Sequence, residues 1–435
     1  MCYAIPGKVK RFEGKLAVID YFGEERKAHN ELDNLLVGDY VYAQGGYVIT
    51  KVSAAEAEST LAAWKETFFE LQEVDVELSR LDLGSHGQSR LVKSIDRIMA
   101  GHIPDQEEML DIFSQTDSEK LELIYKAANF LRQKHLSNSC CVHGIIEISN
   151  LCDKSCNYCG ISILNEKVKR YRMAPDEVVA TAIDAAEKYG FKSLVLQSGE
   201  SSAYTIDELC YMVRTIKEKA PMLVCVSFGE VGLDGLEKLY KAGARAILMR
   251  FETSNPILYA KLHPGQNLDL RLAHLKKAYE LGYLVMTGGL IGLPGQSDED
   301  IINDIILTKE LKAEMASFGP CLAHPDTPLA NIKPLDKNKV LKTLALMRFY
   351  DRDNAKILVT TAFETLDKDA RKDGLLAGAN SVMLNVTPIE YRGHYSIYPN
   401  RAHAKDEIAD QISETLNILH ALGRDPTDLG IAERS

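Results

Sequence analysis

Three cysteines in one short loop are the residues of this sequence with the clearest chemical potential. Cys152, Cys156 and Cys159 are separated by three and then two residues, and they follow a β-branched apolar run at 145–148. Three thiolates are too few to close a structural zinc site and too clustered for a disulfide framework. They could hold three irons of a four-iron cluster and leave the fourth iron open, with the flat ring of Tyr158 beside it. The alternative is a zinc loop completed by a distant histidine.

The cysteine spacing also resembles a known signature. A three-residue gap, a two-residue gap and an aromatic residue before the third cysteine are similar to the loop of the radical S-adenosylmethionine (SAM) enzymes. The resemblance implies one 4Fe-4S cluster on the three cysteines and SAM at its open iron. We therefore expect two cofactors, the cluster and SAM.

Size, charge and cysteine content narrow the class of protein. The 435 residues predict one large and one small domain. The net charge of −11 is spread along the chain without a basic cluster, which argues against nucleic acid or an anionic membrane as the main partner. No apolar run approaches the roughly twenty residues of a membrane helix. Nine cysteines without a leader segment predict a cytoplasmic protein.

The first part of the chain predicts a small β-barrel followed by a helix. Short alternating segments at 16–19, 39–42 and 47–50 are separated by turns. From Ser53, an expected N-cap, the apolar period becomes helical. The segment that follows this helix is polar and rich in Gly and Ser, which is typical of a linker. We therefore expect a small barrel with its helix at 1–80, a linker at 81–88 and a second domain at 89–435.

From residue 143 on, strands and helices alternate. Amphipathic helices intervene between apolar segments, for example at 175–188, and further helices before residue 143 and at the C-terminal end complete the domain. Eight strand-helix units predict an α/β fold, a (β/α)8 TIM-type barrel whose chemistry sits at the C-terminal strand ends. The expected strands are 144–149, 193–197, 222–227, 245–250, 284–291, 315–318, 356–361 and 380–384.

Polar and glycine residues stand where these strands end. Glu200 could pair with the ammonium of SAM, and Gly199 beside it permits a close backbone approach. Glu230 follows the third strand. Arg250 and Glu252 share a face at the end of the fourth, where burial would demand a polar ligand or an internal salt bridge.

Later segments extend the candidate site. Arg271 could bind a carboxylate bidentately. The glycine-rich turn at 288–296, with Gly292 and Leu293, would let an adenine lie against the backbone. His324 could be a ligand or could cap its loop. Hydroxyls, a thioether and a tyrosine predict a substrate cavity that is moderately polar rather than charged, and its residues are Thr360, Thr361, Met383 and Tyr391.

Residues 1 to about 75 resemble HypC, the maturation chaperone of nickel-iron hydrogenases. The matching segments are 2–9 and 38–41. The resemblance implies that Cys2 helps to bind an iron with cyanide and carbon monoxide ligands, assisted by a histidine. Gln44 stands where that histidine is expected, and a carboxamide is a poor iron ligand. Two interpretations stay open: a docking or structural module with an unused Cys2, and a metal carrier.

Residues from about 88 to 400 resemble HydE, the radical SAM maturase of iron-iron hydrogenase. The matching segments are the cysteine loop and 169–173, 195–200, 292–296 and 324–330. The resemblance implies that Glu200, Arg250, Glu252 and Arg271 bind SAM, and that the four cavity residues named above contact the substrate. Phe251 and Cys225 depart from the residues familiar in that family. Because no cysteine follows Cys321, we expect no second cluster.

The HydE resemblance also implies an activity and partners. SAM would be cleaved reductively to methionine and a 5′-deoxyadenosyl radical, which would act on an iron carbonyl-cyanide precursor in hydrogenase cofactor assembly. The expected partners are that small iron complex, other hydrogenase maturation proteins and an electron donor such as flavodoxin or ferredoxin.

Three other functions compete with this hypothesis. A mutase of the methylornithine synthase type would need more charge in the cavity than Thr360, Thr361 and Met383 offer. A biotin synthase would need further cysteines at strand ends, where Cys225 stands alone. A non-enzymatic iron-ligand carrier would use the HypC-like module, with the large barrel as its scaffold.

Overall fold

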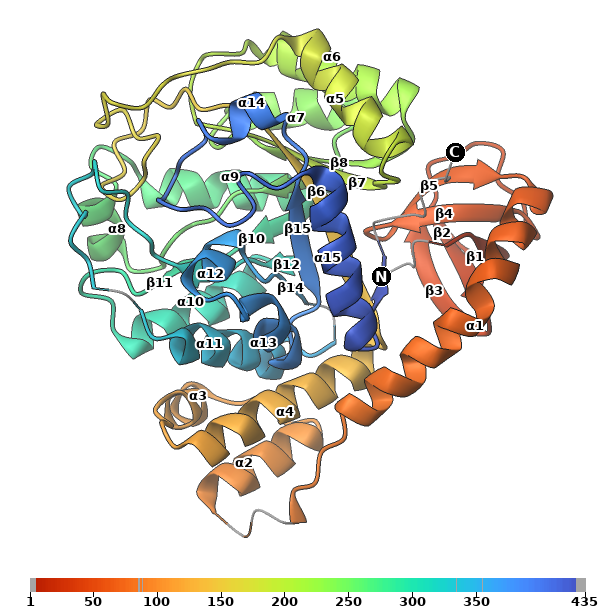
Figure 1. Ribbon diagram of the computed structural model, residues 1–435, viewed down its shortest axis with the longest axis horizontal. Coiled ribbons are helices and arrows are strands. Elements are labelled where there is room, and N and C mark those ends of the chain that lie inside the picture. Colours follow the sequence, from red (N-terminus) through yellow and green to blue (C-terminus); the bar gives the residue numbers. More distant parts are fainter. Residues whose placement is uncertain (1–4, 85–86, 88, 334, 354, 428–435) are drawn as a thin grey trace.

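Two β-barrels of different size lie beside each other, and a long helix connects them (Figure 1). The structure is a computed structural model that describes residues 5–84, 87, 89–333, 335–353 and 355–427. Within these ranges no helix is long and apolar enough to cross a membrane.

The small barrel follows from the alternation of apolar and polar side chains. Its strands close in the order β1-β2-β3-β5-β4. Val9, Ile19 and Val41 point inward, and Phe68 from the following helix packs against them. The expected small β-barrel is therefore confirmed. The strands are β1 (Gly7–Glu13), β2 (Leu16–Tyr21), β3 (Glu24–His29), β4 (Tyr40–Gln44) and β5 (Tyr47–Val52).

Helix α1 (Ala54–Leu78) leads away from the small barrel. The hydroxyl of Ser53 accepts a hydrogen bond from the Glu56 N–H at 3.2 Å, which confirms the predicted N-cap. We call β1–β5 and α1 the N-terminal module. Between α1 and the next helix lies the expected linker, of which residues 85, 86 and 88 fall outside the described residues; the domain boundaries stay a prediction.

A buried ion pair fastens α1 to the large barrel. Both carboxylate oxygens of Asp75 accept hydrogen bonds from Arg132 at 2.7 Å, and the Arg424 Nε lies 3.3 Å from Asp75. All three side chains are buried. Arg132 belongs to the last of three bracing helices: α2 (Arg90–Met99), α3 (Gln106–Phe113) and α4 (Ser118–Leu136).

Eight parallel strands form the large barrel, as predicted. They pair in the order β14-β12-β10-β9-β8-β7-β6-β15. The ends of this sheet meet through a bridge between Leu358 and Ser381 and the hydrogen bond from Val359 N to Ser381 O at 2.9 Å, so the barrel nearly closes. The strands are β6 (Ser139–Ser149), β7 (Ser193–Ser198), β8 (Leu223–Ser227), β9 (Ala246–Leu248), β10 (Leu284–Thr287), β12 (Met315–Ala316), β14 (Lys356–Ile357) and β15 (Ser381–Asn385).

One predicted strand is divided in two. The expected strand at 284–291 stops at Thr287 and resumes as β11 (Leu290–Ile291), which pairs with β13 (Gly319–Pro320). The chain bends at Gly288, where a Cβ would lie 2.3 Å from the Ser317 carbonyl oxygen. Only glycine permits that approach, and the alternation pattern does not reveal it.

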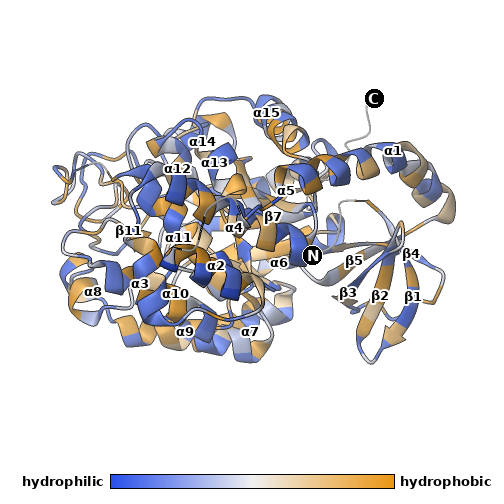
Figure 2. Ribbon diagram, turned by 90° about the horizontal axis from the view of Figure 1, so that it is seen from below, coloured by the Kyte–Doolittle hydropathy of each residue, from blue (hydrophilic) through white to orange (hydrophobic). Residues whose placement is uncertain are grey.

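Helices surround the barrel, and polar and apolar residues are mixed along them (Figure 2). Helix α11 (Lys337–Tyr350) differs from its neighbours because its residues 340–349 are all buried. The helix predicted at 175–188 is α5, one residue shorter. The helices are α5 (Pro175–Glu187), α6 (Ile206–Lys219), α7 (Leu233–Ala242), α8 (Pro256–Leu262), α9 (Leu268–Leu281), α10 (Asp298–Glu310), α11 (Lys337–Tyr350), α12 (Thr361–Leu366), α13 (Ala370–Leu376), α14 (Ile389–Arg392) and α15 (Ile408–Ala421). A short strand, β16 (Asp425–Pro426), pairs with the start of β6.

The Asp75 ion pair makes the attachment of α1 testable. Asp75→Ala leaves the buried guanidinium of Arg132 without its carboxylate, so we expect the free energy of unfolding to fall by about 3–5 kcal/mol. Urea unfolding followed by circular dichroism measures the change. Glu73→Ala, at an exposed position of the same helix, is the control and should change stability by less than about 0.5 kcal/mol. Equal effects of the two variants would contradict the role of the ion pair.

Candidate active site

A cavity of about 270 Å³ opens at the C-terminal ends of the barrel strands. This is the end at which the chemistry of such barrels is found. Its wall includes all three cysteines of the loop that follows β6, together with residues from the ends of several other strands. The barrel therefore brings the cysteine loop and the strand-end residues into one space.

The cysteine loop is held against the end of β7 by backbone contacts. The Asp153 N–H donates to the Glu200 carbonyl at 2.9 Å, and the Gly199 N–H donates to the Ser149 carbonyl at 2.9 Å. A Cβ on Gly199 would lie 2.2 Å from the Leu151 carbonyl oxygen. Glycine at position 199 is therefore required for the approach of the two segments.

The three thiols are half-buried in the wall of the cavity. Burial raises the pKa of Cys152 and Cys159, and it raises the pKa of Cys156 to about 12. Neighbouring thiolates would raise the pKa of Cys156 and of Cys159 further, so three thiolates need additional positive charge beside them. Bound metal supplies that charge, because a coordinating thiol is deprotonated.

The thiols fit a cluster better than a single ion. Among the residues that the structure describes, no three His, Cys, Asp or Glu side chains converge as ligands of one metal ion. Thiolates of a four-iron cluster each bind a different iron, so they need not converge. The amide of Gln266 donates to the Cys156 sulfur at 3.4 Å and orients it.

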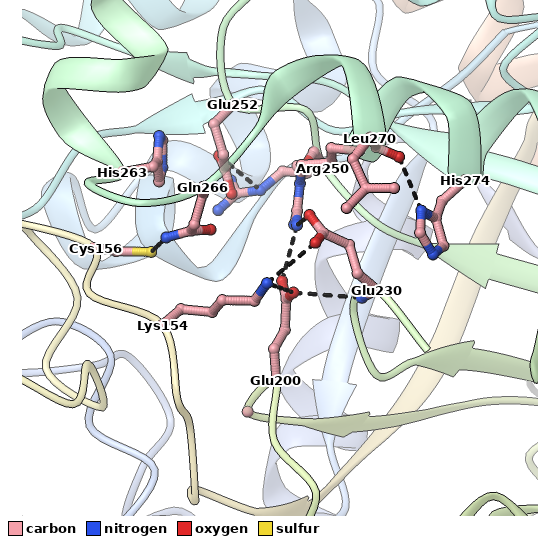
Figure 3. A network of polar contacts seen from close by, with 12 residues as sticks. Lys154, Cys156, Glu200, Glu230, Arg250, Glu252, His263, Gln266, Leu270 and His274 are labelled. Atoms are coloured by element: carbon pink, nitrogen blue, oxygen red, sulfur yellow. Dashed lines mark hydrogen bonds and ion pairs between the residues drawn. The ribbon is translucent and has the colours of Figure 1, made fainter. Parts of the chain in front are cut away.

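A network of four charged side chains lies next to the cysteines (Figure 3). Nη1 of Arg271 is 2.9 Å from Glu200 and 3.2 Å from Glu230, and Nζ of Lys154 is 3.0 Å from Glu230 and 3.6 Å from Glu200. Two cations and two carboxylates balance one another. Burial raises the pKa of Glu200, but the charges of Arg271 and Lys154 lower it more, so the pKa lies below its ordinary value. The Arg271 guanidinium has the larger effect of the two cations.

Glu252 stands apart from this balanced network. Its pKa is raised by burial, and the nearest Arg250 nitrogen is 3.5 Å away. Its Oε2 has no hydrogen-bond partner among the described residues, although it lines the cavity. An internal salt bridge alone therefore does not satisfy this carboxylate, and a ligand with hydrogen-bond donors fits it.

Tyr158 is fixed by a histidine that the sequence reasoning missed. The carbonyl of Tyr259 can only accept, so His263 Nδ1 donates to it at 3.1 Å and its Nε2 accepts from the Tyr158 hydroxyl at 2.9 Å. Burial lowers the pKa of His263 to about 4, so the imidazole is neutral and suited to this acceptor role. The two rings meet edge to face at 5.6 Å.

Most of the predicted site residues line the cavity, and a few do not. Glu230, which belongs to the charged network, lines an adjoining pocket instead of the cavity. Gly292 and Leu293 are not in the wall, because their N–H groups donate to the Gln296 side chain at 2.8 and 3.2 Å. Tyr391 is also outside, since its hydroxyl donates to Glu177 at 2.9 Å. The predicted residues in the wall are Cys152, Cys156, Tyr158, Cys159, Gly199, Glu200, Arg250, Glu252, Arg271, Thr360, Thr361 and Met383.

The cavity wall holds a charged residue that the sequence analysis did not predict. Arg401 and Asn385 line the cavity, and both donate to the fully buried Glu147 at 3.1 Å. Glu147 stands in an apolar strand, Ile-Ile-Glu-Ile, and a carboxylate in such a run was a signal that sequence reasoning could have used. The sequence analysis did not predict Arg401, because this residue comes from a C-terminal loop that carries no recognisable motif.

Other residues singled out in the sequence have structural roles here. Cys225 is buried inside the barrel, 3.8 Å from the sulfur of Met286, and does not line the cavity. His324 Nδ1 accepts from the Asp326 N–H at 3.2 Å and caps its own loop. Phe251 is fully buried. Gln44 is buried at the end of β4, and Cys2 lies outside the described residues.

Comparisons with known proteins agree with this geometry. The model of the Radical SAM superfamily matches residues 146–307, and the HupF/HypC family model matches residues 1–64. The [FeFe] hydrogenase maturase subunit HydE of Thermotoga maritima is 38% identical over 321 residues, which are 74% of this chain and 91% of that protein.

Solved structures show the same fold. Methylornithine synthase aligns with a TM-score of 0.67 at 23% identity, over 77% of this chain and 97% of that one. The FeFe-hydrogenase maturase HydG from Carboxydothermus hydrogenoformans aligns with a TM-score of 0.67 at 20% identity, over 84% of this chain and 85% of that one.

The barrel, the cysteine loop and the matched superfamily define a radical SAM enzyme, whose cofactors are a 4Fe-4S cluster and SAM. The residues in the cavity fit both groups, through three half-buried thiols and the unsatisfied Glu252 carboxylate. The chain belongs to the HydE family of hydrogenase maturases, and it carries a HupF/HypC domain at its N-terminal end.

The loop after β9, which carries Glu252, depends on an acid with a raised pKa. Asp304 Oδ1 accepts from the N–H and the hydroxyl of Ser254, both at 2.6 Å, and burial raises the pKa of Asp304 to about 7. An acid with a raised pKa contributes its full stabilisation below the ordinary Asp pKa of 3.8, and this contribution is lost as the pH rises from there to about 7.

Asp304→Asn removes that ionisation. Relative to the wild type, we expect the variant to gain about 2 kcal/mol of stability between pH 5 and pH 8. Urea unfolding at both pH values measures this difference. Asp298→Asn, at an exposed position of the same helix, is the control and should show a constant offset. A constant offset for Asp304→Asn as well would contradict the raised pKa.

Proposed function

We propose that the large barrel cleaves SAM reductively and directs the product at an iron carbonyl-cyanide precursor during hydrogenase cofactor assembly. One observation carries the proposal: a single cavity joins the three cysteines, the charged strand-end residues and the wall formed by Thr360, Thr361 and Met383. The similarity to the [FeFe] hydrogenase maturase subunit HydE of Thermotoga maritima supports a role in hydrogenase maturation. When bound, the cluster supplies the electron that splits SAM into methionine and a 5′-deoxyadenosyl radical.

The residues of the chain have separate roles in this proposal. Cys152, Cys156 and Cys159 hold the cluster. Glu200 accepts from the ammonium of SAM, and Arg271, which already faces Glu200, pairs with the carboxylate of SAM. Glu252 accepts from the remaining donors of SAM, because its Oε2 is otherwise unsatisfied. Tyr158 offers a flat face whose position His263 fixes.

The substrate side of the cavity offers hydrogen-bond donors to a polar ligand. Thr360 Oγ1 accepts from the Phe363 N–H at 3.3 Å, so its hydroxyl proton is available to a ligand. Arg401 contributes a guanidinium to the wall, held in place by Glu147. A cyanide ligand or an amino-acid carboxylate on the iron complex would match these donors.

The same arginine favours a second candidate function. Our sequence argument against a mutase of the methylornithine synthase type was the lack of charge in the cavity, and Arg401 removes that argument. An amino-acid substrate with a free carboxylate therefore stays as the alternative. The fold similarity to methylornithine synthase does not separate the two activities, since it reflects the barrel alone.

Product formation in the presence of each substrate class separates these functions. Anaerobically reconstituted protein is mixed with SAM, a reductant and either an iron carbonyl-cyanide cysteine complex or a panel of free amino acids. We expect 5′-deoxyadenosine, measured by mass spectrometry, to rise at least about tenfold with the iron complex only. A rise with an amino acid alone would favour the mutase, and SAM cleavage indifferent to the iron complex would refute our substrate assignment.

Cysteine variants separate the enzyme from a carrier. Cys156→Ser should abolish 5′-deoxyadenosine formation and hydrogenase maturation together. Cys210→Ser, which removes a buried thiol on α6 outside the cavity, should leave both unchanged. Maturation that survives the loss of all three loop cysteines would show that the HypC-like module acts as a carrier.

Glu252→Gln tests the SAM site by binding alone. The amide keeps the size of the side chain but loses an acceptor oxygen, so we expect the Kd for SAM to rise about 10- to 100-fold. Isothermal titration calorimetry on cluster-loaded protein measures the change. Glu299→Gln, exposed on α10, is the matched control. An unchanged Kd for Glu252→Gln would remove Glu252 from the SAM site.

A further inference from the structure

The N-terminal module packs against the amino-terminal end of the large barrel, opposite the cavity. Tyr47 and Ile49 of β5 form one apolar cluster with Leu223 and Leu284, the first residues of β8 and β10. Figure 1 shows β5 beside this end of the barrel. The contact is therefore made directly with the sheet.

The turn between β4 and β5 is fitted to this contact. Gly45 has a φ of +55°, and a Cβ there would lie 2.6 Å from Leu223 and 3.1 Å from Leu284. Its neighbour Gly46 has a φ of +84°, but a Cβ there would meet no described atom within 4 Å. The two glycines share a backbone conformation, and only Gly45 touches the barrel.

Polar contacts also connect the N-terminal module to residues that precede neighbouring strands of the large barrel. The Tyr47 hydroxyl donates to the Gly282 carbonyl, before β10, at 3.1 Å. Arg245, before β9, donates to the Glu31 carboxylate at 2.8 and 3.0 Å. Before β7, the Lys192 ammonium lies 4.8 Å from the centre of the Tyr42 ring.

The module contacts the starts of β7, β8, β9 and β10, and it also contacts Leu136 and Ser137 just before β6. Three of these strands, β7, β8 and β9, carry the charged side of the cavity. Strands β7, β8, β9 and β10 begin at the module and end at the site. Gly199 and Glu200 follow β7, Glu230 follows β8, and Arg250 and Glu252 follow β9. Each strand is a short rigid element, so its two ends cannot move independently.

We propose that the N-terminal module is a fixed support that holds the SAM-binding half of the barrel from its opposite end. The proposal rests on the SAM-binding roles assigned above. Local opening of a sheet is suppressed where its strands make further buried contacts. A site that is already ordered binds its ligand more tightly, because less conformational entropy is lost on binding.

The second attachment of the module supports this role. Asp75 near the end of α1 pairs with Arg132 and Arg424, so the module is anchored both at β5 and at α1. Two separate anchors restrict rotation about either one. This arrangement differs from a carrier arm, which would need freedom to move.

Two adjacent glycines give a matched pair of variants for the test. Gly45→Ala and Gly46→Ala both place a side chain at positive φ, but only Gly45→Ala pushes against Leu223 and Leu284. Hydrogen exchange is followed by mass spectrometry in peptides covering β8 and β10, with β15 as the internal reference. The Kd for SAM is measured by calorimetry on cluster-loaded protein.

We expect Gly45→Ala to accelerate exchange in β8 and β10 about tenfold and to raise the Kd for SAM about fivefold. Gly46→Ala should leave both within about twofold, and β15 should exchange at the same rate in all proteins. Should Gly45→Ala fail to fold, Tyr47→Phe with Glu31→Gln removes the two polar contacts without added bulk, and smaller changes in the same direction are expected.

The outcomes distinguish this proposal from the proposed function. Faster exchange in β8 and β10 with an unchanged Kd for SAM would overturn the support role, as would no change in either measurement. A wild-type protein that holds a cluster but binds no SAM would instead refute the proposed function, and hydrogen exchange would still report whether the module stabilises the strands.

Discussion

The close approach of the cysteine loop to the end of β7 is the constraint on which the site depends. Gly199 lets the backbone at Leu151 come within a distance that any side chain would prevent, and Asp153 then hydrogen-bonds to Glu200. Because of this contact, three cysteines and the first charged residue of the cavity share one wall. Neither segment reaches the other in a barrel with a bulkier residue at position 199.

Charge balance explains how so many ionised groups are tolerated at the barrel mouth. Glu200 and Glu230 are neutralised by Arg271 and Lys154, and Glu147 is neutralised by Arg401. A buried charge without a partner destabilises a fold by several kcal/mol, so these pairs are required before any ligand binds. Glu252 has only the Arg250 ion pair at 3.5 Å, and its Oε2 has no hydrogen-bond partner among the described residues, so this acceptor marks where a ligand completes the structure.

Much of the fold can be predicted from the sequence because strands and helices produce local patterns of apolar and polar residues. The period of apolar residues located all eight strands of the large barrel, and the barrel rule placed Glu200, Arg250 and Glu252 at one end. Contacts between distant segments have no such pattern. Gln296 captures the N–H groups of Gly292 and Leu293, and Glu177 captures Tyr391, so these predicted residues turn away from the cavity.

Long-range pairing also explains the residues that the sequence did not reveal. Lys154 lies between two cysteines in the sequence. Its role is visible only in the fold, where the loops after β7 and β8 place Glu200 and Glu230 beside it. Arg401 comes from the C-terminal loop and donates a hydrogen bond to Glu147 on β6, the first strand of the large barrel. In both cases the cation pairs with a carboxylate that a barrel strand carries or that follows its end. The carboxylates of the strands therefore determine which distant cations form the wall, and a search for the substrate site begins most usefully from Glu147.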